Sequence, residues 1–521
     1  MKFRDCDAGI CSRCSNPARR FCRLVTRGIS SVEIMREKPQ CSWPNGADAP
    51  PASDAGKAPA KSPVNAPAGI WGQIKTKPIK MNPMKKITHL NPWTAGLAVL
   101  GVISMTSVLH AEAVAPAAPA NTSQTQEATP PPAAAPAPGL LMTGLGKAGL
   151  AEPLNKAGIN IYGYIEGGYM QDFSASSSHD GPTFMGFNNY KNTAILDKIS
   201  LNVERTVDPT KKQFDVGFRL EGIYGADAAP WIHSYGLADT QTGRNQLDPL
   251  QAYVDIALPG VPMKLRVGKW IELAGFEQFS ANIYGAFGDP TRGLYSYSYQ
   301  FLYAEPGTQT GAYLTYVFNP KLTVDAGITR GWNASVKDQN SSIDFLGRVT
   351  YTPTDKTTVI FVMTEGPEYP IGAGVGLPSG DNSDYWTALD LVITHKVTDK
   401  LSLGLGFDYV ETPHIPGNTG SDLQWGGVAQ YVSYAFNPHF TLNTRLEWYS
   451  DAANGFSTGA GTSADYYAAT AGVAIKPFPN DKVFSNLIIR PEIRYDYSDK
   501  PVFASGEHDQ LTFNVDAIFT F

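Results

Sequence analysis

The sequence has no cysteine after Cys41, no apolar run of the length a membrane-spanning helix needs, and no excess of basic residues. No second CxxC or CxxH follows Cys11-Ser-Arg-Cys14, so we expect no metal there. The cysteine-free remainder suits export through an oxidising periplasm. A formal net charge of −6 argues against a nucleic-acid partner. After these exclusions, the spacing of the apolar residues along the chain is the main remaining indication of the fold.

Motifs for catalysis and nucleotide binding are also missing. The eight histidines are scattered, and no HExxH, GxSxG, GxGxxG or GxxxxGK[ST] occurs. Glu272 and Glu277 could form an acid/base pair, but the interpretation we favour is a solvated pore constriction or loop salt bridges. We therefore expect no enzyme activity, no cofactor and no metal. A hydrolase built from scattered residues at the rim of a barrel stays open as the alternative.

The N-terminal part of the chain has the composition of targeting and linker segments. A charged start at Met84, a short apolar stretch and an A-x-A site ending at Ala113 predict a signal peptide over residues 84–113. Residues 1–83 are then a disordered, non-native upstream extension, although an unusually long presequence is the alternative. Residues 114–157, rich in alanine and proline at their start, are expected to be a periplasmic linker.

The last eleven residues alternate strictly between apolar and polar side chains. Odd positions from Leu511 to Phe521 are all apolar, and even positions are polar except Ile518. A period of two over a strand length gives one apolar and one polar face. The terminal Phe521 after Phe519 resembles the end signal that the barrel-assembly machinery reads in outer-membrane barrels. The alternative is the edge strand of a soluble β-sandwich.

The same alternation continues through residues 158–521, where short turns and long polar loops follow one another in order. Seven short turns and eight long loops predict an all-β, antiparallel transmembrane β-barrel of about sixteen strands. Residues 298–304 also look strand-like, but a strand there would reverse the alternation, so we assign residues 273–307 to one long third loop. The turns are expected near residues 207–210, 259–262, 319–321, 353–356, 398–400, 437–439 and 479–482, and the loops near residues 172–192, 227–246, 273–307, 333–341, 367–383, 412–422, 451–463 and 499–508.

Charged side chains fall on the inward positions of the predicted strands, which predicts a water-filled lumen because a lipid-facing Arg or Lys costs about 2–4 kcal/mol at mid-depth. Both signs are present, so no single-sign ring for strong ion selectivity is expected. The residues predicted to line the pore or its constriction are Arg219, Glu221, Arg266, Glu272, Glu277, Arg292, Arg445, Glu447, Arg490, Glu492, Arg494 and Asp496.

Three short motifs resemble the OmpL-like outer-membrane β-barrel porin family: residues 163–169, 267–277 and 304–312. The resemblance covers about residues 159–521. It implies a bacterial outer-membrane channel for passive diffusion of small hydrophilic solutes, in contact with membrane lipid and compatible with a homo-oligomer. Family members often carry Ser-Arg-Ser before the Glu-Pro segment, whereas this chain has Tyr-Ser-Tyr-Ser-Tyr at residues 295–299. A barrel with a closed lumen that acts as a scaffold or adhesin is the alternative function.

The third loop is the longest connection, and long irregular loops are usually functional. If it folds into the lumen, its charges would face Arg490, Glu492 and Arg494 across a constriction and set up a transverse field. The charged loop residues are Glu277, Asp289, Arg292 and Glu305.

The order of charged, apolar and A-x-A segments predicts that the mature chain starts near Val114 and contains no cysteine. N-terminal sequencing of the protein purified from its native membrane measures this directly. A mature start within residues 1–80 would contradict the interpretation of that region as a non-native extension.

Overall fold

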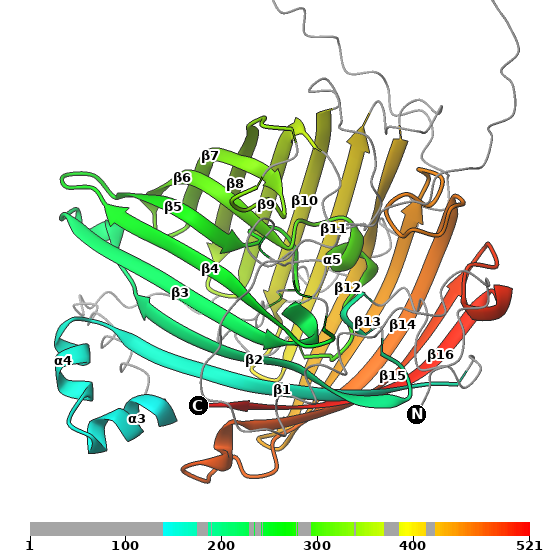
Figure 1. Cartoon of the computed structure of the whole chain (residues 1–521), viewed down its shortest axis with the longest axis horizontal. Helices are drawn as coiled ribbons and strands as arrows, with labels where there is room; N and C mark the ends of the chain where they lie inside the picture. The colour runs from blue at the N-terminus through cyan, green and yellow to red at the C-terminus, as the bar shows by residue number, and fades with distance from the viewer. Residues whose placement is uncertain are drawn as a thin grey trace, which may run out of the picture. The chain divides into compact units, whose positions relative to one another are not determined.

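The computed structural model describes residues 139–173, 186–188, 190–228, 234, 241, 243–277, 279, 293–337, 340–368, 385–412 and 423–521. Its sixteen strands form one closed antiparallel barrel in which each strand pairs with the next and β16 returns to β1 (Figure 1). The predicted fold class and strand number are confirmed. The strands are β1 Asn160–Asp172, β2 Thr193–Arg205, β3 Asp215–Gly225, β4 Gln246–Ala257, β5 Met263–Ile271, β6 Thr308–Asn319, β7 Leu322–Trp332, β8 Asp344–Thr354, β9 Thr357–Pro367, β10 Tyr385–Lys396, β11 Leu401–Thr412, β12 Leu423–Asn437, β13 Phe440–Asp451, β14 Ala464–Ile475, β15 Leu487–Ser498 and β16 Asp509–Thr520.

Short helices accompany the barrel. None of the helices in the described residues combines the length and apolar character needed to cross a bilayer. The segment predicted as a signal peptide lies outside the described residues, as do the upstream extension and the first part of the linker. The last part of the expected linker forms two helices before β1. The helices are α3 Leu140–Lys147, α4 Ala151–Lys156, α5 Tyr299–Tyr303 and the 3-10 turns η1 Gly186–Asn188, η2 Pro209–Lys211, η3 Ala226–Ala228, η4 Phe484–Asn486 and η5 Ala504–Gly506.

Side-chain oxygens close several of the short turns. Asp208 Oδ1 accepts a hydrogen bond from Thr210 N at 2.9 Å, and Asn319 Oδ1 accepts one from Lys321 N at 2.8 Å. Asp and Asn favour turns because their side chains can satisfy a backbone N–H two residues on. All seven predicted turns lie between consecutive strands, which fixes the register of each hairpin.

The last strand shows how the alternation is used. Leu511 and Phe513 point outward and are 36% and 39% exposed, whereas Thr512 and Asn514 point inward and are buried. Ile518, the one apolar residue at a polar position, is also buried and packs against Tyr164 inside the barrel. The exception to the alternation therefore has a structural reason, because Ile518 forms a small apolar cluster with Tyr164 where the first and last strands meet.

The first and last strands, β1 and β16, run side by side and close the barrel (Figure 1). Gly163 and Phe521 exchange two backbone hydrogen bonds: Gly163 N donates to Phe521 O at 2.9 Å, and Phe521 N donates to Gly163 O at 2.8 Å. A Cβ on Gly163 would lie 2.3 Å from Ser200 O and 2.9 Å from the Phe521 ring. Only glycine therefore fits at this seam.

Because Phe521 contributes two backbone hydrogen bonds to the seam between β1 and β16, we predict that deleting it lowers the amount of assembled barrel severalfold and leaves protein in the periplasm. Cell fractionation with immunoblotting measures both pools. Phe513→Ala, on the same face of the same strand, is the matched control and should assemble. Equal outer-membrane levels of the deletion variant and the wild type would contradict the proposed assembly role of Phe519 and Phe521.

Candidate functional site

The interior of β13 and β15 carries a row of alternating charges. Every second residue points inward on a strand, so each of these side chains faces the lumen side of the wall. All of them are buried although they are charged. We call these residues the charged ladder: Arg445, Glu447, Arg490, Glu492, Arg494 and Asp496.

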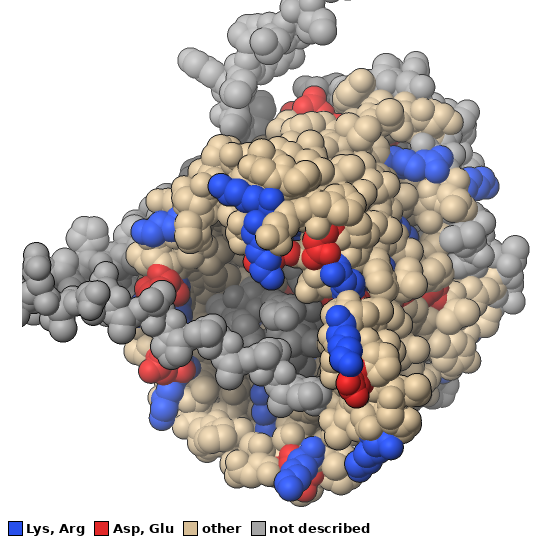
Figure 2. Space-filling model, turned by 90° about the vertical axis from the view of Figure 1, so that its left-hand side faces the viewer, with Lys and Arg blue, Asp and Glu red and all other residues tan. Residues whose placement is uncertain are grey.

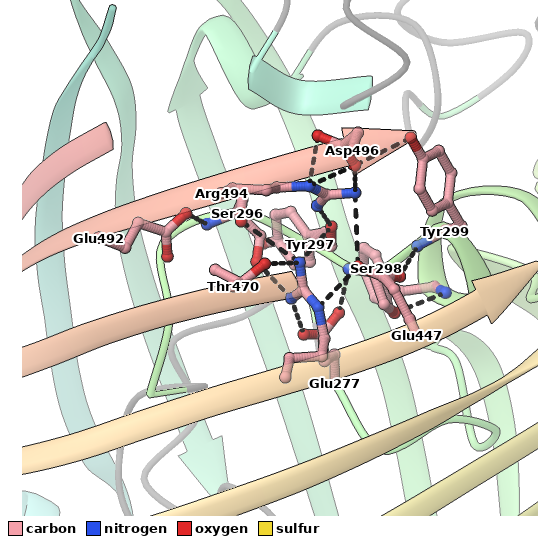
Figure 3. Close-up of polar contacts among 12 residues, drawn as sticks. Glu277, Ser296, Tyr297, Ser298, Tyr299, Glu447, Thr470, Glu492, Arg494 and Asp496 are labelled. Atoms are coloured by element: carbon pink, nitrogen blue, oxygen red, sulfur yellow. Dashed lines mark hydrogen bonds and ion pairs between the residues drawn. The ribbon is translucent and has the colours of Figure 1, made fainter. Parts of the chain in front are cut away.

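The third loop, which connects β5 to β6, covers the charged ladder (Figure 3). Its backbone carbonyls face the arginines: Arg490 Nη1 donates to Leu294 O at 2.9 Å, and Arg445 donates to Ser296 O at 2.8 Å and to Tyr297 O at 3.0 Å. Arginine can do this because its guanidinium presents five donors in a fixed plane.

The backbone N–H groups of the same segment face the carboxylates. Glu492 accepts hydrogen bonds from Tyr295 N at 2.7 Å and Ser296 N at 3.1 Å, and Glu447 accepts one from Tyr299 N at 2.8 Å. Residues 294–299 therefore have donors and acceptors satisfied by the charged ladder, in the way a neighbouring strand would satisfy them.

The loop adds a carboxylate of its own. Glu277 lies 2.7 Å from Arg445 Nη1 and also accepts a hydrogen bond from Ser298 N at 2.6 Å. On the adjoining part of the ladder, Asp496 accepts hydrogen bonds from the Tyr299 hydroxyl at 3.0 Å and from Arg494 Nε at 2.8 Å. The loop and the wall thus share one network of buried ion pairs, and the short helix α5 continues directly from it.

A second contact holds the loop to β2. The Tyr295 hydroxyl donates to Asp197 Oδ1 at 2.8 Å, and Lys198 Nζ lies 4.2 Å above the Phe279 ring. Lys198 is also ion-paired with Glu166 at 3.1 Å. The described part of the third loop therefore reaches from β2 to β15 across the inside of the barrel.

Three further carboxylates meet beneath the third loop, and their ligand atoms lie within 4.8 Å of one another. Glu305 comes from the loop, while Asp390 on β10 and Asp408 on β11 are direct register partners. Burial, together with the adjacent Asp408 and Asp390 carboxylates, raises the pKa of Glu305 well above its usual range. Earlier in the loop, burial raises the pKa of Glu272 to about 8, although a hydrogen bond from Phe279 N acts to lower it.

The opposite part of the barrel carries paired charges that the described loop residues do not cover. Cross-strand ion pairs join Arg266 to Asp255 at 2.7 Å and Arg348 to Asp325 at 2.7 Å. The Arg266 guanidinium also stacks 3.6 Å from the Tyr253 ring. We call the four basic residues here the basic wall: Arg219 on β3, Lys264 and Arg266 on β5, and Arg348 on β8.

The structure places the predicted pore residues in different parts of the interior. Arg219 and Glu221 on β3 and Arg266 on β5 lie away from the charged ladder, although Arg219 and Glu221 are themselves buried, and Glu272 lies at the start of the third loop. Arg292 and Asp289 lie outside the described residues. The remaining predicted residues join the loop to the wall: Glu277, Arg445, Glu447, Arg490, Glu492, Arg494 and Asp496.

One geometric expectation is corrected. The sequence suggested loop carboxylates facing the wall arginines across an open constriction, but the loop lies directly on those arginines. A 2.7 Å contact between Glu277 and Arg445 leaves no water-filled gap between them. The physical reason is that the backbone N–H and C=O groups of this irregular loop need partners, and the charged ladder supplies them.

The sequence analysis did not identify Lys198 and Glu166 as loop supports, and it did not bring Asp390 and Asp408 together. A signal for that pair was available. Asp390 and Asp408 are equidistant from Asp399 in a tight turn, so hairpin register places them opposite each other on one face. No comparable signal could have placed Glu305 with them, because loop paths are not periodic.

A closed sixteen-strand barrel with a charged interior and a loop packed inside it defines an outer-membrane porin, a channel-forming class of protein. The chain belongs to the family described as "Putative beta-barrel porin-2, OmpL-like", which matches residues 158–521. The resemblance expected from the three short motifs is therefore confirmed. No curated protein matches the sequence.

Several solved structures are similar to this chain. The outer membrane channel DcaP of Acinetobacter baumannii is 12% identical, with 70% of this chain and 98% of that chain covered and a TM-score of 0.44. The anion-selective porin from Comamonas acidovorans is 11% identical, with 70% and 99% covered and a TM-score of 0.45. OprB of Pseudomonas putida is 12% identical, with 72% and 97% covered and a TM-score of 0.44.

Because Arg445 joins Glu277, Glu447 and two loop carbonyls, we predict that Arg445→Gln loosens the third loop. Breaking a buried ion pair costs about 3–5 kcal/mol, which corresponds to more than about 100-fold in a local opening equilibrium. Hydrogen–deuterium exchange of residues 295–299 should accelerate accordingly. Arg348→Gln, which removes a paired arginine remote from the loop, is the control. Unchanged exchange in the Arg445 variant would show that the ladder does not hold the loop.

Proposed function

We propose that the protein is a passive diffusion channel in which small hydrophilic solutes pass along the basic wall while the third loop narrows the lumen. The observation that carries this proposal is the difference between the two sides of the barrel interior. One side is sealed by the loop on the charged ladder, and the other keeps charged side chains accessible to water.

The exposure of the arginines supports this assignment of the path. The side chains of Arg266 and Arg348 are 14% and 25% exposed, whereas those of Arg445, Arg490 and Arg494 are at most 1% exposed. A solute can contact only groups that water reaches. The role of the charged ladder in our proposal is therefore to position the constriction rather than to touch the solute.

Charge along the path favours weak discrimination. Each accessible basic group is paired, as Arg219 is with Glu221 at 3.0 Å and Lys264 is with Asp255 at 2.9 Å. The hollowed end on the side of the β4–β5 turn likewise has basic and acidic side chains around it (Figure 2). Since the basic members are the more exposed ones, we expect a modest preference for anions over cations.

The described histidines support a non-enzymatic role. The Nδ1 atoms of His439 and His508 lie 3.1 Å and 2.9 Å from the backbone carbonyls of Lys476 and Ser498, and His395 Nδ1 contacts a threonine hydroxyl at 2.9 Å. These are turn and strand-end contacts, unlike the base-and-nucleophile pairing that catalysis requires.

The apolar exterior completes the proposal. Outward residues such as Leu446 and Ile493 are 57% and 50% exposed, as lipid-facing positions are in an isolated barrel. We propose that the chain is exported by its signal peptide, inserted by the barrel-assembly machinery and surrounded by outer-membrane lipid. The same exterior is compatible with a homo-oligomer, which native mass spectrometry of the solubilised protein would reveal.

Single-channel recording of the refolded protein in planar bilayers tests the function. We predict stable ohmic conductance for the wild type and a larger conductance when the third loop is shortened between residues 280 and 292. Arg266→Gln combined with Arg348→Gln should shift the reversal potential toward cations. Arg494→Gln, under the loop, is the matched control and should change conductance without that shift.

Absence of conductance in the wild type would contradict the channel and favour a closed scaffold. Conductance that ignores both sets of substitutions would place the path elsewhere in the barrel.

A further inference from the structure

The cluster of Glu305, Asp390 and Asp408 differs from the other charged groups inside the barrel. All three side chains are buried, with the residues 7%, 4% and 3% exposed. Their ligand oxygens lie within 4.8 Å of one another. Three carboxylates so close together repel one another strongly when they are ionised and shielded from water.

These buried carboxylates have few hydrogen-bond partners among the described residues. Both oxygens of Asp390, both oxygens of Asp408 and one oxygen of Glu305 accept no hydrogen bond of normal geometry. Gly275 N contacts Asp390, the Gln300 side chain contacts Asp408, and the two aspartates contact each other, which requires a shared proton when no cation is bound. Like charges directly opposite each other on neighbouring strands are destabilising, and Asp390 and Asp408 are such a pair.

Two other buried carboxylates of the interior have arginine partners. Asp516 is paired with Arg490 at 2.5 Å, and Glu447 with Arg445 at 2.9 Å. In contrast, no lysine or arginine among the described residues forms an ion pair with Glu305, Asp390 or Asp408. A cation from solution would supply the missing charge and the missing partners at once.

We propose that Glu305, Asp390 and Asp408 bind a calcium ion that fixes the third loop to β10 and β11. Calcium takes 6–8 oxygen ligands at about 2.3–2.6 Å and accepts carboxylates in one- or two-oxygen modes. Three carboxylates with unpartnered oxygens offer that chemistry, and they lack the imidazole or thiolate ligands that zinc and copper favour.

The position of Glu305 gives the ion a structural role. Gly275, with a positive φ of 86°, lies so close that a Cβ there would be 1.9 Å from Glu305 Oε2. The first and last parts of the third loop thus meet at the carboxylate cluster. The ion fastens the loop on the β10–β11 side, and the charged ladder fastens it on the β13–β15 side. This inference rests on the proposed role of the loop as the constriction.

Isothermal titration calorimetry with calcium chloride on the EDTA-treated, detergent-solubilised full chain tests the site. We expect one calcium ion per chain, with a Kd of about 10⁻³ M or tighter. Glu305→Gln should weaken binding at least tenfold, and Asp390→Asn with Asp408→Asn should abolish it. Asp255→Asn, a wall carboxylate paired with Arg266, is the matched control and should bind as the wild type does.

Thermal unfolding gives a second readout, because the difference in unfolding temperature between variant and wild type should change sign between EDTA and calcium. In EDTA the Asp390→Asn, Asp408→Asn variant should unfold at a higher temperature than the wild type, because the repulsion is gone. With calcium present the order should reverse. If the double variant does not fold, Glu305→Gln alone carries the test, because it lies in the loop and outside the strand register.

A wild type that takes up no calcium at millimolar concentration overturns the proposal, and so does wild-type affinity in the Asn variants. Conductance distinguishes this failure from failure of the channel. An open channel without calcium binding leaves the proposed function intact, whereas calcium binding to a protein without conductance rejects the channel and keeps the site.

Discussion

The contact between residues 294–299 and the charged ladder is the interaction on which the interior depends. An irregular loop backbone inside a barrel has donors and acceptors that no neighbouring strand satisfies, and leaving them unpaired would cost about 1–3 kcal/mol each. Arginines meet the carbonyls and glutamates meet the N–H groups, as Arg490 and Glu492 do on β15. The buried charges and the buried loop therefore each supply what the other requires.

This arrangement divides the lumen into two unlike halves. On the β13–β15 side, the charged side chains are buried and form hydrogen bonds and ion pairs with the third loop and with one another. On the β3–β8 side, the ion pairs run across neighbouring strands, as between Asp325 and Arg348, and keep part of their surface in water. The arginines of the barrel therefore fall into two sets. Those of the charged ladder are buried and hold the third loop, whereas those of the basic wall are partly exposed to water.

Much of this fold could be predicted from the sequence because alternation and turn chemistry are local signals. The strand number and the loop assignment of residues 298–304 follow from the alternation of short turns and long loops, and the inward position of Arg494 follows from a period of two. The covering of Arg494 could not be predicted, since it depends on the path of a loop with no periodicity. Ile518 shows the converse: a break in the pattern marked a real contact, with Tyr164.

The third loop also connects parts of the chain that are far apart in sequence. Tyr295 hydrogen-bonds to Glu492 across 197 positions, and Tyr299 to Asp496 across the same separation. These contacts require β15 to be in place in the barrel wall, so the position of the third loop depends on a strand far later in the sequence. A substitution in β15 would therefore act on the width of the lumen through a loop that belongs to the first half of the barrel.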